Sequence, residues 1–249
     1  MTSYSVGIPA LAILTTSLLL AGIWRAYRSP RAVAWALAAA LAWWSVSGAL
    51  ASAGVLARFD ARPPPIAPFM ASVLVLGVVL GLSPVGRRLA TALPLGVLVI
   101  VQGFRFPLEL GMHRAALDGV MPNALSYSGY NFDVVTGGSA LLVGALALTN
   151  RAPRALVWAW NLVGIAALAM IAFIAVATSP MVRAFGDDQL NTWVARVPYV
   201  WLPAINVVFA IAGHVVVTRK LLAERSAGAD QEKNRRSALG ASAPPTIST

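Results

Sequence analysis

Cysteine is absent from this chain of 249 residues, and histidine occurs only twice, as His113 and His214. Without cysteine the chain forms no disulfide, carries no thiolate nucleophile and offers no sulfur ligand to a metal. Two histidines limit metal coordination further. The sequence therefore predicts neither a metal site nor a bound cofactor.

Charged residues are also scarce, at 11% of the chain against roughly 25% in an average soluble domain. Apolar residues account for 58%, and the mean hydropathy is +0.74. A soluble domain of this size could not keep so much apolar surface from water. The composition excludes an ordinary soluble enzyme, a disordered chain and a nucleic-acid-binding domain. The net charge of +10 instead suits the cytoplasmic loops of a membrane protein.

Seven stretches contain no Asp, Glu, Lys or Arg: residues 1–24, 32–57, 63–86, 89–104, 134–150, 155–182 and 197–218. A helix of about 20 apolar residues crosses ~30 Å of hydrocarbon. Five of the stretches reach that length alone, and 89–104 and 134–150 reach it with a neighbouring polar residue. Because the backbone must satisfy its own hydrogen bonds in lipid, we predict an all-α, polytopic membrane protein with seven transmembrane helices.

Basic residues divide unequally between the two sets of loops that this arrangement creates. Ten lie on the side that begins with Arg25, and six lie on the side that begins with Arg58. Cytoplasmic loops are enriched in basic residues, so we predict the N-terminus outside and the C-terminus in the cytoplasm. Residues 1–223 would form the transmembrane domain, and the polar residues 224–249 a disordered cytoplasmic tail.

Small residues recur at four-residue spacing in two predicted helices, as Gly77 with Gly81 and as Ala140 with Gly144. This spacing allows helices to approach closely. Seven helices in one chain offer many internal partners, so we favour packing within the chain over a homodimer interface.

Polar residues concentrate between Gln102 and Asp133. Arg105, Glu109 and His113 are four residues apart, so on a continuous helix they share one face. A charge embedded in a membrane faces a bundle interior or a cavity and has a partner. The sequence thus predicts an outward-facing binding pocket lined by Gln102, Arg105, Glu109, His113, Asn131 and Asp133.

A purely structural interpretation of the same residues stays open. Arg105 and Glu109 could end a helix at the interface, with the arginine reaching outward. His113 could be a solvated loop residue, and Asn131 or Asp133 could cap the next helix.

A second polar pair, Asn161 and His214, falls in the inner half of two antiparallel predicted helices. The simplest interpretation is one interhelical hydrogen bond. His214 and His113 should lie near opposite membrane faces, because ~24 Å of helix separates Pro198 from His214. They are therefore poor candidates for a shared metal site.

A family likeness rests on four segments: Phe104–Leu110, His113-Arg114, Gly129–Asp133 and Trp201-Leu202-Pro203. Together they resemble a group of uncharacterised bacterial seven-helix integral membrane proteins. The resemblance implies a multi-pass protein of the bacterial cytoplasmic (inner) membrane and supplies no activity. The positions that match the pattern are Arg105, Glu109, His113, Asn131, Asp133, Trp201 and His214.

Three functions fit these features. The leading hypothesis is a protein that binds or transports a small molecule or ion through the outward-facing polar pocket. The first alternative is an intramembrane enzyme, with Glu109 or Asp133 as general base and Arg105 holding a lipid or isoprenoid phosphate. The second is a structural or assembly protein. The bilayer is the expected partner, with anionic lipid at the cytoplasmic face and a small molecule as candidates, and no nucleic acid.

Overall fold

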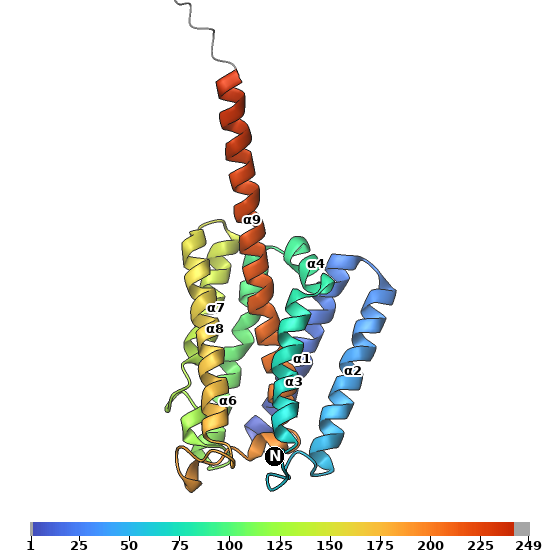
Figure 1. The fold of residues 1–249 in the computed structure, drawn as a ribbon, viewed down its shortest axis with the longest axis vertical. Helices are drawn as coiled ribbons and strands as arrows, with labels where there is room; N and C mark the ends of the chain where they lie inside the picture. Colours follow the sequence, from blue (N-terminus) through green and yellow to red (C-terminus); the bar gives the residue numbers. More distant parts are fainter. Residues whose placement is uncertain (1, 242–249) are drawn as a thin grey trace, which may run out of the picture.

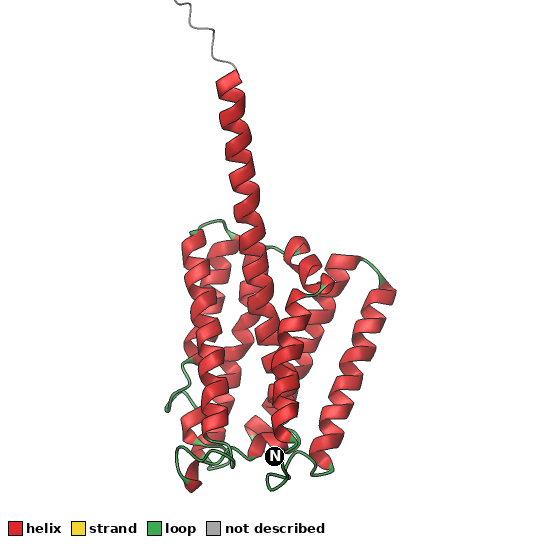
Figure 2. Ribbon diagram, viewed as in Figure 1, coloured by secondary structure: helices red, strands yellow, loops and turns green. Residues whose placement is uncertain are grey.

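The structure is a computed structural model that describes the backbone of residues 2–241 and the side chains of residues 2–226. In these residues the regular structure is all helical, with loops between the helices and no strand (Figure 2). The α-helices are α1 (Ser3–Tyr27), α2 (Pro30–Ser52), α3 (Ile66–Leu82), α4 (Pro84–Ala92), α5 (Leu95–Ile100), α6 (Arg105–Leu117), α7 (Asp133–Leu148), α8 (Arg154–Ala177) and α9 (Val208–Ala241). The short helical turns are η1 (Val101–Phe104), η2 (Asn123–Leu125), η3 (Asp187–Gln189), η4 (Trp193–Ala195) and η5 (Leu202–Val207).

Five helical segments are long and apolar enough to cross a membrane. Three are the single helices α1, α2 and α8; the others are the continuous runs Leu95–Leu117 and Leu202–Ser226. The bent pair α3 and α4 passes the same test when taken together, and α7 is a shorter apolar helix. The expectation of an all-α fold is therefore confirmed, and its long apolar helices are compatible with a bundle in a membrane.

The helices pack side by side as a bundle, with the first part of α9 in its interior (Figure 1). The α1–α2 connection, α4, the α7–α8 connection and the exit of α9 lie at one end (Figure 1). The N-terminus lies at the opposite end, near the loops that enter α3 and η5 (Figure 1).

The chain is broken inside the charge-free stretch 89–104. Helix α4 ends before Leu93, whose backbone is extended, and the next span begins after Pro94. Proline disfavours helical backbone in the residue before it and has no N–H to donate. A single helix starting near Leu89 is therefore wrong. The run that is long and apolar enough to cross a membrane is Leu95–Leu117, and Arg105 lies near its middle rather than at its end.

Helices α3 and α4 meet at an angle of 54°. The Gly77 and Gly81 pair of α3 lies against α9, where a Cβ on Gly77 would sit 2.8 Å from Cβ of Ile211. The guanidinium of Arg219 donates to the carbonyls of Gly81 and Ser83, at 2.9 and 3.0 Å. These contacts satisfy carbonyls that the end of α3 leaves free. The glycine pair thus packs within the chain, as its spacing suggested.

The outer faces of the helices are apolar and exposed, above all on α2, where only Ser47 and Ala51 are buried. Trp35 on that helix is 78% exposed. Patches of this extent on a soluble monomer would be unusual. They are the expected surface of a bundle that faces lipid.

Helix α9 extends to Ala241, well beyond the span that ends at Ser226. The structure continues the helix through residues 224–241, the first part of the expected disordered tail. Residues 224–241 contain no proline and many Ala, Glu, Arg and Lys, which are good helix formers. Residues 242–249, the rest of the expected tail, lie outside the described residues.

Candidate functional site

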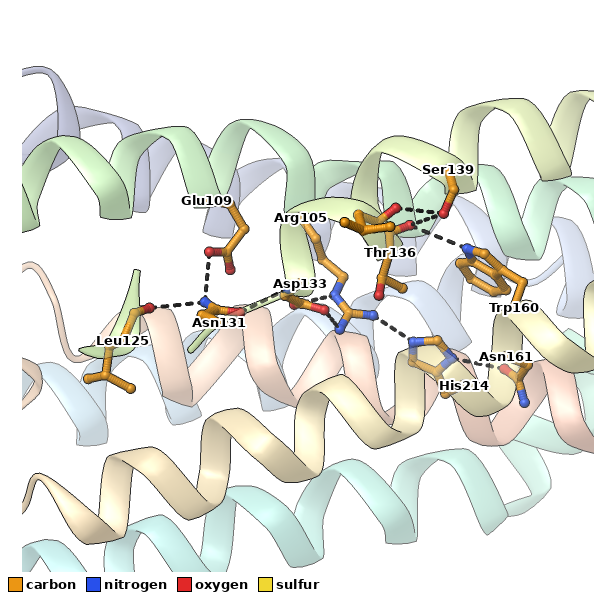
Figure 3. A network of polar contacts seen from close by, with 11 residues as sticks. Arg105, Glu109, Leu125, Asn131, Asp133, Thr136, Ser139, Trp160, Asn161 and His214 are labelled. Carbon is orange, nitrogen blue, oxygen red and sulfur yellow. Dashed lines mark hydrogen bonds and ion pairs between the residues drawn. The ribbon is translucent and has the colours of Figure 1, made fainter. Parts of the chain in front are cut away.

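Arg105 lies at the centre of the bundle, with a relative exposure of 1%. Its Nε donates to Oδ2 of Asp133 at 2.6 Å, and its Nη2 donates to Oδ1 of the same carboxylate (Figure 3). Two parallel bonds of this kind are the strong geometry for an arginine and a carboxylate. Asp133, one of the predicted pocket residues, is thus paired with Arg105.

A glycine in α7 brings the two halves of this ion pair together. A Cβ on Gly137 would lie 2.9 Å from the backbone carbon of Arg105 and collide with the N–H of Phe106. Any larger residue would push α6 and α7 apart. Because Asp133 lies one turn before Gly137 on α7, the close approach of the backbones sets the reach of the Arg105–Asp133 bond.

The third contact of Arg105 joins it to the pair that the sequence placed in the inner half. Its Nη1 lies 2.6 Å from Nε2 of His214. Arginine has only donors, so Nε2 accepts, and the proton of the ring is on Nδ1. Nδ1 then donates to Oδ1 of Asn161 at 2.8 Å. His214 is therefore a neutral, oriented acceptor for Arg105.

The chain of donors continues beyond His214. Asn161 Nδ2 donates to the Thr218 hydroxyl at 2.8 Å, and that hydroxyl donates to the His214 carbonyl at 2.9 Å. Gly164 makes room for the imidazole, because a Cβ there would collide with Cε1 of His214 and lie 2.6 Å from Nε2. The predicted Asn161–His214 hydrogen bond is confirmed, but it is one link in a longer network.

Glu109 forms the other end of the network, one turn from Arg105 and equally buried. Its Oε2 accepts from Asn131 Nδ2 at 2.7 Å. The same Nδ2 donates to the Leu125 carbonyl, and Oδ1 of Asn131 accepts from the N–H of Asp133 (Figure 3). Asn131 therefore holds the start of α7, as the structural interpretation allowed, and orients Glu109 as well.

The start of α7 lies deep in the bundle, because Asp133 is its first residue and pairs with Arg105 in mid-span. With 16 residues, α7 is only about 24 Å long at 1.5 Å per residue. The chain before it, from Ser126 to Phe132, reaches this depth without forming a helix. Non-helical backbone at membrane depth is tolerated where it is buried in protein or lines a cavity.

Two of the predicted pocket residues lie apart from this cluster. His113 stacks on Tyr127 at 4.2 Å between ring centres, and its Nδ1 lies 3.2 Å from the Ser126 hydroxyl. Gln102 is fully buried against Gly213, and neither atom of its amide has a hydrogen-bond partner in the described residues. Gln102 lines a separate cavity of about 220 Å³ between α1, α4, α5 and α9.

A larger cavity of about 440 Å³ lies beside the polar network. Its walls come from α3, α6, α8, η5 and the start of α9, and it contains the side chains of Arg105, Glu109 and Asp133. Leu74 of α3 and Val176 of α8 line it and are 42% and 60% exposed, so it reaches the outer surface of the bundle between these helices. The lining is mainly apolar, whereas the sequence led us to expect a polar pocket.

Four residues that line this cavity each carry a buried polar atom with no hydrogen-bond partner within the described residues. The atoms are Ser179 Oγ, Asn191 Oδ1, Trp193 Nε1 and Asn206 Nδ2. An unpaired buried polar group costs roughly 1–3 kcal/mol. Native proteins hold few such groups, so four among the residues around one cavity single out this part of the bundle as a candidate site.

Sequence reasoning found the charged members of the network and missed the cavity with its unpaired groups. Thr218 could have been added, because it lies one turn after His214 on the same helix. Nothing in the local pattern marks Ser179, Asn191 or Trp193, which lie in the loop between α8 and η5. Their proximity to Glu109 depends on how that loop folds over the bundle.

Comparisons with protein-family models, with curated proteins and with solved structures find no match to this chain. The likeness to bacterial seven-helix proteins therefore stays a prediction. The function has to be argued from the site itself.

Proposed function

We propose that this protein binds a small amphipathic molecule within the membrane, in the cavity enclosed by α3, α6, α8 and the start of α9. The observation that carries the proposal is the cavity itself, with its apolar walls and its buried polar atoms that lack partners. Its volume of about 440 Å³ lies within the ~300–1,000 Å³ typical of small-molecule sites.

The route into the cavity supports an amphipathic ligand over a water-soluble one. The exposed lining residues Leu74, Val176 and Val182 are apolar and lie on or beside α3 and α8. On a bundle surrounded by lipid, this opening faces acyl chains. A molecule would enter the cavity laterally from the bilayer. Its apolar part would then lie against α3 and α8, and its polar end near Glu109.

Methionine side chains suit this use of the cavity. Met70, Met112 and Met181 line it from three different segments of the chain. Methionine is flexible and polarisable, and it adapts to ligands of varied shape. The lining supports a site that accepts a class of related molecules.

We further propose seven membrane crossings in a bacterial cytoplasmic membrane, with the N-terminus outside. The five long spans, the bent pair α3 and α4, and the short α7 together supply the seven. The arginine-bearing α1–α2 and α7–α8 connections and α4 share one end of the bundle (Figure 1). This distribution supports placing that end in the cytoplasm.

The two alternative functions have less support. An enzyme that clamps a lipid phosphate needs arginine N–H groups directed at the substrate, and Arg105 already donates to Asp133 and His214. A structural role through Gly77 and Gly81 needs a free face, and that face packs on α9.

The test uses a matched pair of substitutions on α8. Ala172 lines the cavity, and Ala169 is exposed on the same helix away from it. We expect Ala172→Phe to abolish photolabelling of the cavity by a dodecanol carrying a diazirine, in phosphatidylcholine vesicles. Ala169→Phe should leave the labelling unchanged. Equal labelling of wild type and both variants, or labelling only at exposed positions, would contradict the proposal.

A further inference from the structure

We propose that the ligand of this cavity carries a protonated amine, and that Glu109 is the carboxylate that receives it. The inference rests on the proposed function, because it assigns the polar end of the amphipathic molecule. It follows from comparing the charged side chains of the cavity that are paired within the protein with the one that is not.

The positive charge of Arg105 is already paired within the protein. Both oxygens of Asp133 accept from its guanidinium, and the third nitrogen donates to His214. His214 cannot contribute a second positive charge in this arrangement, because its Nε2 accepts from Arg105 and has no proton. The pair Arg105–Asp133 is therefore neutral as a unit, with a neutral imidazole behind it.

Glu109 has no cation of its own among the described residues. Only one neutral donor, the amide of Asn131, reaches its carboxylate, and it binds Oε2. Asn131 cannot donate a second hydrogen bond to Glu109. Its other Nδ2 proton is donated to the Leu125 carbonyl, and its Oδ1 accepts from the N–H of Asp133. Glu109 lines the cavity, and its hydrogen bond in the described part of the chain is made by Oε2, which leaves Oε1 without one.

A second buried group points to a ligand independently of the acidic residues. Asn206 is 1% exposed, and its Oδ1 accepts from the Thr15 hydroxyl at 3.1 Å. Its Nδ2 has no partner in the described residues, and Asn206 is among the residues that line the same cavity as Glu109. In this orientation of the amide, Nδ2 is available to donate to an oxygen of the ligand.

These two groups define the polar end of the ligand. An ammonium would donate to Oε1 of Glu109 and supply the countercharge that an embedded carboxylate requires. A hydroxyl or carbonyl oxygen close to the amine would accept from Asn206. An anionic end group is disfavoured, since it would bring a second unpaired negative charge to Glu109.

The experiment compares amphiphiles that share one chain and differ only at the end group. Dodecylamine, dodecanol and dodecyl phosphate compete with the diazirine-bearing dodecanol for wild-type protein in neutral phosphatidylcholine vesicles. A charge-assisted hydrogen bond predicts that dodecylamine competes about tenfold or more better than dodecanol. Dodecyl phosphate should compete least.

Glu109→Gln is the variant that assigns the effect, because glutamine keeps the shape and an oxygen for Asn131. In this variant dodecylamine should lose its advantage, while dodecanol competes as it does in wild type. Equal competition by dodecylamine and dodecanol in wild type overturns this inference and leaves the proposed cavity intact. If no amphiphile competes with the probe, the proposed function fails as well. The wild-type series remains decisive even if the variant does not fold.

Discussion

Removing one charge of the Arg105–Asp133 pair should destabilise the bundle strongly. The two side chains are 1% and 5% exposed. Breaking a buried ion pair by deleting one partner costs about 3–5 kcal/mol, because the remaining charge is then buried with neither a counter-ion nor water to stabilise it. For a chain of this size, that corresponds to a drop in Tm of about 6–20 °C. We expect this for Asp133→Asn, measured by thermal unfolding in detergent through tryptophan fluorescence.

A double-mutant cycle that combines Asp133→Asn with Arg105→Gln measures the interaction energy between these two side chains apart from their other contacts. Once Asp133 is neutral, removal of the arginine charge should cost much less than it does alone. The two costs should therefore fail to add by about 2 kcal/mol or more.

A more exposed ion pair at the C-terminal end of α6 provides the control. Arg114 and Asp118 lie 3.2 Å apart, with side chains 61% and 30% exposed. Neutralising either residue should cost ~0–1 kcal/mol. If Asp133→Asn costs no more than Asp118→Asn, or if the buried costs add, the network does not stabilise the bundle as argued here.

Two further predictions concern helix contacts. Gly164→Ala should lower the stability by about 1–3 kcal/mol, because its Cβ would displace the His214 ring. Gly7→Ala, with nothing within 4 Å of the new Cβ, should be neutral or stabilising in the same thermal assay. Arg219→Ala should cost about 1.5–3 kcal/mol, since its guanidinium bonds two carbonyls at the end of α3. Arg225→Ala, at an exposed position of α9, serves as its control, and equal Tm values for the two would refute the capping role.

The sequence determined two features of the protein: that its helices are apolar enough for a membrane, and which charged residues are buried among them. Charge-free stretches predict membrane-spanning helices because an unpaired backbone or side-chain polar group is costly in lipid. The four-residue spacing of Arg105 and Glu109 placed them on one helical face, and both are buried on α6. Asn161 with His214 was likewise predicted as a pair, because polar side chains in neighbouring spans bond to each other.

The tertiary structure alone decided how these parts combine. The break at Pro94 shifts the span that follows, so that Arg105 lies at mid-depth and reaches His214. The sequence predicts Arg105 and His214 in different halves of the membrane, because a charge-free stretch does not show at which residue the helix that carries Arg105 begins. Helical periodicity is local, whereas the register of one helix against another depends on small residues such as Gly137 and Gly164.

The cavity is the clearest case of a feature that only the folded chain holds. Its unpaired groups come from the α8–η5 loop and from η5, far from Glu109 in the sequence. Each of them is an ordinary polar residue in its own segment. They form one site only because the packing of α3, α6, α8 and α9 brings them around the same cavity.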